Sequence, residues 1–155
     1  MHQQEKVSIN DLSRLYNASD ELYHRLAVYY GMADSNLWVL YSLYLSEHAC
    51  TPMELAKTWS LPKQTVHSAL KALEKNGYIC MQPSPDNKKN RLVLLTEAGR
   101  QLAERVTVPV VAAERRAFAQ LTEEEQQQLI YLMTKHYDLL EREIENLMRG
   151  ERKDI

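Results

Sequence analysis

The apolar residues of this chain recur at spacings of three and four over most of its length, which is the periodicity of amphipathic helices. One stripe runs through residues 9–30 and is expected to end near Gly31, since glycine readily takes the left-handed conformation that ends a helix. Another runs through residues 129–147, behind a capping box of Thr122 and Glu125. The pattern therefore predicts a long helix at each end of the chain.

Three shorter helices are expected in succession between these two. LWVLYSLYLSE at 37–47 is apolar on most sides, which predicts a deeply buried helix capped by Asp34 or Ser35. TPMELAKTW at 51–59 opens with a second capping box and is broken by the SLP that follows. Because the turn is so tight, the next helix, starting near Pro62, should cross the previous one at a steep angle.

The helix after Pro62 has two contrasting faces, and a hairpin is expected behind it. Its apolar face should pack inward, whereas its polar face carries Gln64, His67, Ser68, Lys71 and Lys75. After Asn76-Gly77, two β-prone runs at 78–84 and 91–96 flank the basic loop PDNKKN. Thr96 then caps a helix that extends to about residue 118.

Helix, turn, outward-facing polar helix and basic hairpin make, in this order, a winged helix-turn-helix. We therefore expect a mainly α fold with a small β-hairpin wing, and a DNA-binding domain at 34–96. Residues 1–33 and 97–155 are assigned to a helical dimerisation region, because the terminal apolar stripes are too long for one small core to cover.

The charge distribution supports double-stranded DNA as the partner. The whole chain has a net charge of −2, but residues 52–91 carry seven cations and three anions. Side chains of the polar helix offer donors and acceptors to base edges, and cations of the hairpin can release counterions from phosphates. The expected DNA-binding residues are Lys63, Gln64, Thr65, His67, Ser68 and Lys71 on the helix, and Lys88, Lys89, Asn90 and Arg91 on the hairpin.

The chain resembles the MarR family of bacterial transcription regulators over nearly its whole length. The resemblance rests on LAKTWSLPKQTVHSALKALEKNGYI at 55–79 and DNKKNRLVLLTEAG at 86–99. The family's wing commonly reads Asp-x-Arg, a short strand, and Leu-Thr-x-x-Gly. Leu95, Thr96 and Gly99 match this pattern, whereas the Asp falls on Asn87 and the Arg on Lys89.

The resemblance implies a homodimer, with terminal helices interlocked, that binds a pseudo-palindromic operator as a repressor. It also implies an effector site between the dimer helices and the DNA-binding domain. Eight of the twelve aromatic residues lie in the first 59 positions. A small aromatic or phenolic effector is therefore expected at Tyr16, Tyr23, Trp38 and Tyr41, the alternative being that these rings only pack the core and the dimer.

Other chemistries find less support in the sequence. There is no nucleophile with a base, no paired carboxylates and no phosphate loop, so we expect no enzyme, no cofactor and no bound metal. A redox-responsive regulator using Cys50 or Cys80, a metal-responsive regulator, and a winged helix that binds only protein stay open as alternatives. The N-terminus is too polar for a secretory signal and no apolar run could span a membrane, so a cytoplasmic protein is expected.

Overall fold

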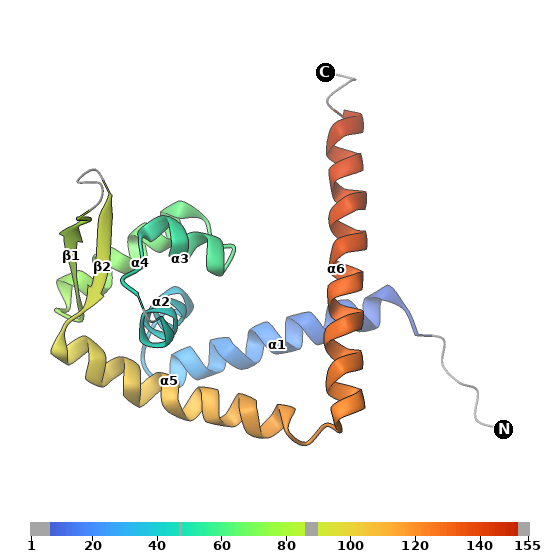
Figure 1. Ribbon diagram of the computed structural model, residues 1–155, viewed down its shortest axis with the longest axis horizontal. Helices are drawn as coiled ribbons and strands as arrows, with labels where there is room; N and C mark the ends of the chain where they lie inside the picture. Colours follow the sequence, from blue (N-terminus) through green and yellow to red (C-terminus); the bar gives the residue numbers. More distant parts are fainter. Residues whose placement is uncertain (1–6, 47, 86–89, 152–155) are drawn as a thin grey trace. The chain divides into compact units, whose positions relative to one another are not determined.

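The computed structural model describes residues 7–46, 48–85 and 90–151 of the chain, which forms two compact units, Met1–Val110 and Val111–Ile155. The elements of the first unit, shown in Figure 1, are α1 (Ile9–Tyr29), α2 (Asp34–Leu45), α3 (Pro52–Thr58), α4 (Lys63–Lys75), β1 (Ile79–Pro83) and β2 (Arg91–Leu95). Helix α5 (Glu97–Phe118) crosses the boundary between the units, and α6 (Glu123–Glu151) belongs to the second. The predicted fold class is confirmed.

Helices α1 and α4 end where the sequence predicted, and each is followed by a glycine in the left-handed conformation. Gly31 after α1 and Gly77 after α4 have φ values of +69° and +74°, in the left-handed region. In each case the next residue donates its N–H back to a carbonyl of the last turn: Met32 to Ala27 O, and Tyr78 to Leu73 O. These bonds satisfy carbonyl groups that the end of a helix would otherwise leave free.

Both predicted capping boxes are present. The Glu54 carboxylate accepts the backbone N–H of Thr51 at 2.6 Å, while the Thr51 hydroxyl accepts the N–H of Glu54 at 3.2 Å. The bonds from Thr51 hold the pKa of the Glu54 carboxyl below its ordinary value. Thr122 and Glu125 make the same reciprocal pair at the start of α6.

The predicted cap of α2 is wrong. The helix begins at Asp34 itself, and Ala33 occupies the N-cap without a side-chain hydrogen bond. The Asp34 carboxylate lies 3.0 Å from Nδ1 of His24, which comes from α1. The Asp34 carboxylate therefore contacts His24 of another helix and does not cap α2.

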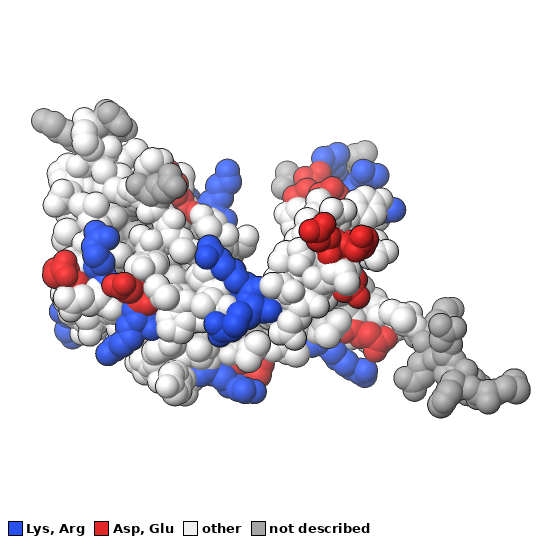
Figure 2. Space-filling model, turned by 60° about the horizontal axis from the view of Figure 1, so that its bottom comes forward, with Lys and Arg blue, Asp and Glu red and all other residues white. Residues whose placement is uncertain are grey.

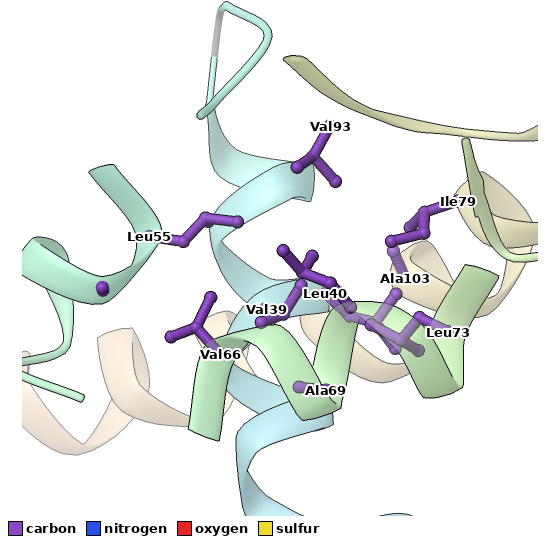
Figure 3. Close-up of a cluster of buried hydrophobic side chains, with 11 residues drawn as sticks. Val39, Leu40, Leu55, Val66, Ala69, Leu73, Ile79, Val93 and Ala103 are labelled. Atoms are coloured by element: carbon purple, nitrogen blue, oxygen red, sulfur yellow. The ribbon is translucent and has the colours of Figure 1, made fainter. Parts of the chain in front are cut away.

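The core lies where α2, α3 and α4 meet the hairpin, and Figure 3 shows the side chains that fill it. Helix α2 is central, as its apolar sequence predicted, because Val39 and Leu40 lie within this cluster. A smaller cluster of Ala27, Leu37 and Val106 joins α1 and α2 to α5. The N-terminal half of α5 is thereby fixed to the winged helix.

The apolar stripes of α1 and α6 are largely exposed. Leu140 and Ile144 in the middle of α6 have 49% and 46% of their surface accessible, and Leu15 and Leu22 of α1 are more exposed still. The described residues leave the α6 stripe and the first part of the α1 stripe uncovered, whereas Leu26, Ala27 and Tyr30 at the end of α1 pack in the smaller cluster. None of the helices in this part of the chain is both long and apolar enough to cross a membrane.

Candidate nucleic-acid interface

Helix α4 is held against the core by one face and leaves the other free. Val66, Ala69, Leu70 and Leu73 are each at most 3% exposed, as their spacing predicted. The turn before α4 is tight: Ser60 has a φ of +49°, and Leu61 donates its N–H to Ala56 O at 2.9 Å. This turn fixes the start of α4 relative to α3.

The free face of α4 carries the residues that the sequence predicted. Lys63, Gln64, His67, Ser68 and Lys71 are exposed, and Thr65 is half-buried. Together they present amide, imidazole, hydroxyl and ammonium groups over about two turns of helix, a span that fits the major groove of DNA. The structure therefore brings the six predicted helix residues onto one element, with five of them exposed.

The wing is an antiparallel pair in which Ile79 faces Leu95 and Pro83 faces Arg91. Beyond the last pair, Ser84 donates its N–H to Asn90 O at 2.8 Å. Asn90 and Arg91 are exposed, as expected for the predicted contacts. Lys88 and Lys89, the other two predicted wing residues, lie outside the described residues.

Arg91 has a structural contact as well as a charge. Its Nη2 atom donates to Met81 O at 3.0 Å, which links β2 to β1 near the end of the hairpin where Pro83 faces Arg91. The aligned Asp-x-Arg positions of the family hold Asn87 and Lys89 in this chain. Among the described residues, the side-chain bond that connects the two strands is the one from Arg91 to the Met81 carbonyl. Among the described residues the Arg91 guanidinium makes no other hydrogen bond, so its remaining N–H groups can bind phosphate.

The base of the wing is locked to the start of α5. The Thr96 hydroxyl donates to Gly77 O at 2.6 Å and accepts the N–H of Gly99 at 3.0 Å. The Thr96 N–H in turn bonds to Tyr78 O at 3.0 Å. A Cβ atom at Gly99 would lie 1.7 Å from Tyr78 O, so only glycine allows this approach. The Leu-Thr-x-x-Gly pattern thus has a direct physical explanation.

Three of the four predicted effector residues form one aromatic cluster. The Trp38 ring lies 4.8 Å from Tyr23 and 5.8 Å from Tyr41, and it stacks on Trp59 at 4.3 Å between centroids. Trp59 was not among the predicted residues, and its Nε1 donates to the Ser42 hydroxyl. Tyr16 is 44% exposed on α1 and makes no ring contact with this cluster in the described part of the chain.

A cavity of about 360 Å³ adjoins the aromatic cluster and is lined by Tyr41 and Trp59 together with Ser42, Thr58 and Glu54. Cys50 also lines it, and its thiol is free and half-buried, as is that of Cys80. Among the residues described, no group of three or more His, Cys, Asp or Glu side chains is placed to hold a metal ion.

Charge is mixed on the face of the molecule in Figure 2, where Lys and Arg side chains lie among wider uncharged areas and are accompanied by Asp and Glu. This agrees with the net charge of −2 of the whole chain. Recognition of DNA by such a protein depends on where a few cations are placed.

Comparisons with known proteins point to one family. Residues 30–89 match the model of the MarR family. A curated helix-turn-helix transcriptional regulator of Staphylococcus aureus is 25% identical over 77% of this chain and 80% of its own length. The regulator NMB1585 of Neisseria meningitidis superposes with a TM-score of 0.78 over 91% of this chain and 99% of its own, at 24% identity. MepR of S. aureus in complex with DNA gives 0.71 over 87% and 99%, at 22% identity.

Proposed function

We propose that this chain acts as a dimeric repressor of a pseudo-palindromic operator, in the manner of the MarR family of winged helix-turn-helix transcription regulators, whose model residues 30–89 match and whose fold it shares. The observation that carries the proposal is the two-sided character of α4. One side is at most 3% exposed, and the other presents polar side chains to solvent. A helix built in this way suits readout of base edges.

Sequence readout is assigned to Gln64, His67 and Lys71, with Lys63, Thr65 and Ser68 beside them on α4. Gln64 and His67 lie in the first two turns of the helix, the part of a recognition helix that reaches the bases, and Lys71 follows about one turn further along the same face. The wing is assigned to phosphates or the minor groove, through Arg91, Asn90, Lys88 and Lys89. Readout there is degenerate, so the wing should add affinity for every sequence alike.

The dimer is proposed from the exposed apolar faces of α1 and α6, with 1–33 and 97–155 as the dimerisation region. A monomer in water would leave both faces uncovered, whereas a second copy could cover them symmetrically. MepR is seen in complex with DNA, which supports DNA as the partner of this fold.

An aromatic or phenolic effector is proposed at the cluster of Tyr23, Trp38, Tyr41 and Trp59, next to the cavity of about 360 Å³. The cluster joins α1 to α2 and to the end of α3, so a ligand there could favour one spacing of the two DNA-binding domains. Coupling between such sites is typically about 1–3 kcal/mol. Tyr16 stays outside this cluster, and its assignment to the effector site rests on the sequence alone.

The first experiment is a selection of bound sequences from random duplexes, followed by affinity measurements on the selected operator and on a scrambled duplex. Lys71→Ala should lose about 1–3 kcal/mol on the operator and much less on the scrambled duplex. Lys75→Ala is the matched control, because Lys75 is an exposed lysine in the last turn of the same helix. It should affect both duplexes weakly and equally.

Arg91→Ala should weaken both duplexes alike and reduce the salt dependence by about one unit per lost phosphate contact. A titration across salt concentrations measures this slope. If Arg91→Ala changed which sequence is preferred while Lys71→Ala lowered both affinities equally, the assignment of α4 and of the wing would be wrong. A protein without preference for duplex DNA at low salt would refute the proposed function as a whole.

A further inference from the structure

The turn between α3 and α4 repeats a helix ending that occurs twice elsewhere in the chain, but with a different residue. After α1 and α4, Gly31 and Gly77 take the left-handed conformation, and the residue after each donates its N–H to a carbonyl of the last helical turn. After α3, Ser60 takes this position, and Leu61 donates its N–H to Ala56 O at 2.9 Å. Among the described residues, Ser60 is the only one other than glycine with a positive φ, which is +49°.

A serine at this position is strained, whereas a glycine is not. The left-handed conformation brings the Cβ atom of an L-residue too close to a backbone carbonyl oxygen, a clash that glycine avoids. Such a residue persists only where the surrounding structure holds it. Because only Leu61 and Pro62 separate Ser60 from the start of α4 at Lys63, the φ of Ser60 sets the direction in which α4 leaves the turn. A released Ser60 would return to negative φ, and α4 would leave in another direction.

Trp59, which directly precedes Ser60, is held by three residues of α2. Its ring stacks on Trp38 with 4.3 Å between the centroids and 27° between the planes. Tyr41 meets the same ring nearly at right angles at 5.7 Å, and the indole Nε1 donates to the Ser42 hydroxyl. Two ring contacts and a directed hydrogen bond thereby fix the end of α3 to α2, next to the strained residue.

We propose that Trp59 is a positioning residue for the DNA-contacting helix: held on α2, it keeps Ser60 in the left-handed conformation and so sets the direction of α4. This rests on the proposed function, because the direction of α4 matters for binding only if α4 reads DNA. A released turn would present α4 in several directions, and the apparent operator affinity would fall with the fraction that fits. Binding to an unrelated duplex depends on cations and phosphates, so it should change little.

The serine separates this role from simple packing of the indole. Ser60→Gly removes the strain of the left-handed conformation, and with it the need for Trp59 to hold the turn. If Trp59 acts through Ser60, the glycine should therefore rescue a variant that lacks the indole. If Trp59 only packed against α2, the glycine would give no rescue, because it restores none of the lost contacts.

The test measures the affinity of the full chain for the selected operator and for the scrambled duplex. Trp59→Leu should weaken operator binding about tenfold, which corresponds to about 1.4 kcal/mol, and scrambled binding less than about twofold. The double variant with Trp59→Leu and Ser60→Gly should return to within about threefold of the wild type on the operator, and Ser60→Gly alone should bind as the wild type does.

Leu102→Ala is the matched control for lost packing. Leu102 is a half-buried residue that packs against the same core, but it lies on α5 and not on α3 or α4. Its replacement should leave the ratio of operator to scrambled affinity unchanged. Two milder variants, Trp59→Phe and Ser42→Ala, remove the donor and the acceptor of one hydrogen bond and keep a ring on Trp38. Each should lower operator affinity, but less than Trp59→Leu does.

Amide hydrogen exchange at Leu61, followed by NMR without DNA, reports on the turn itself. The Leu61 N–H is bonded to Ala56 O, so its protection should fall in Trp59→Leu and return in the double variant. Unchanged protection in Trp59→Leu would show that Trp59 does not hold the turn, and would overturn the proposal.

The proposal is also overturned if Trp59→Leu keeps its operator affinity, if the double variant shows no recovery, or if Leu102→Ala lowers the ratio of affinities as much as Trp59→Leu. Should Trp59→Leu fail to fold, unchanged operator affinity in both milder variants overturns it. A wild-type protein that binds no duplex would refute the proposed function, whereas the exchange at Leu61 would still decide whether Trp59 holds the turn.

Discussion

Replacing Gly99 with alanine is expected to destabilise the protein more than the same change at Gly77 or Gly150. The new Cβ would lie 1.7 Å from Tyr78 O and 2.6 Å from the carbonyl carbon, both of them backbone atoms. An unstrained C···O contact needs about 3.3 Å, so α5 and the start of β1 must separate by more than an ångström. No side-chain rotation can relieve this clash.

The magnitude follows from what that separation disturbs. Overpacking costs about 1–3 kcal/mol in a well-packed region. The Thr96 N–H bond to Tyr78 O, 3.0 Å long, would be stretched or lost at a further cost of about 1 kcal/mol. A total of about 2–4 kcal/mol is a large part of the stability of a small domain, which is usually about 5–15 kcal/mol. The wing would also be displaced, so any folded fraction should bind operator more weakly.

Two other glycines supply the controls. Gly77→Ala introduces no close contact but places alanine at a φ of +74°, which should cost about 1–2 kcal/mol. Gly150→Ala lies in α6 with open space around it and should stabilise by up to about 1 kcal/mol. Denaturant unfolding followed by circular dichroism, at one fixed protein concentration, measures all three. If Gly99→Ala cost no more than Gly77→Ala, the explanation of the Leu-Thr-x-x-Gly pattern would be wrong.

Three further changes test the dimer, the core and the cap of α3. Leu140→Asp should give monomers in sedimentation, because each of two symmetric copies loses about 1.5–3 kcal/mol of apolar burial. The control Gln127→Asp, on the opposite side of α6, should leave dimers. Dimers from both variants would contradict the proposed interface. Thr107→Val should raise unfolding stability by about 1 kcal/mol, since this hydroxyl is fully buried and has no hydrogen-bond partner among the described residues. Glu54→Gln should lower the unfolding stability near neutral pH and leave it unchanged in strong acid. The bonds from Thr51 lower the pKa of the Glu54 carboxyl in the folded protein. Its contribution to stability is therefore complete above the ordinary pKa of 4.5 and is lost as the pH falls through the lower pKa of the folded state. An equal loss of stability at both pH values would contradict this role of the carboxylate.

The sequence by itself determined the elements whose causes are local. The capping boxes of Thr51 and Thr122 connect residues three positions apart, and Gly31 and Gly77 end helices through bonds to the preceding turn. The two faces of α4 also follow from spacing along one helix. In such cases the interacting groups are close in the chain, so the pattern of residues already specifies the geometry.

Only the tertiary structure decided which distant residues share a site. It placed Trp59 on Trp38 and left Tyr16 outside the cluster, and it turned the Asp34 carboxylate to His24 in place of a cap. It also brought Arg105 beside Leu40 and Leu73, which lie far from it in the sequence, around a cavity of about 620 Å³. These juxtapositions depend on how helices pack, and packing is fixed by many long-range contacts at once, which no local pattern of residues encodes.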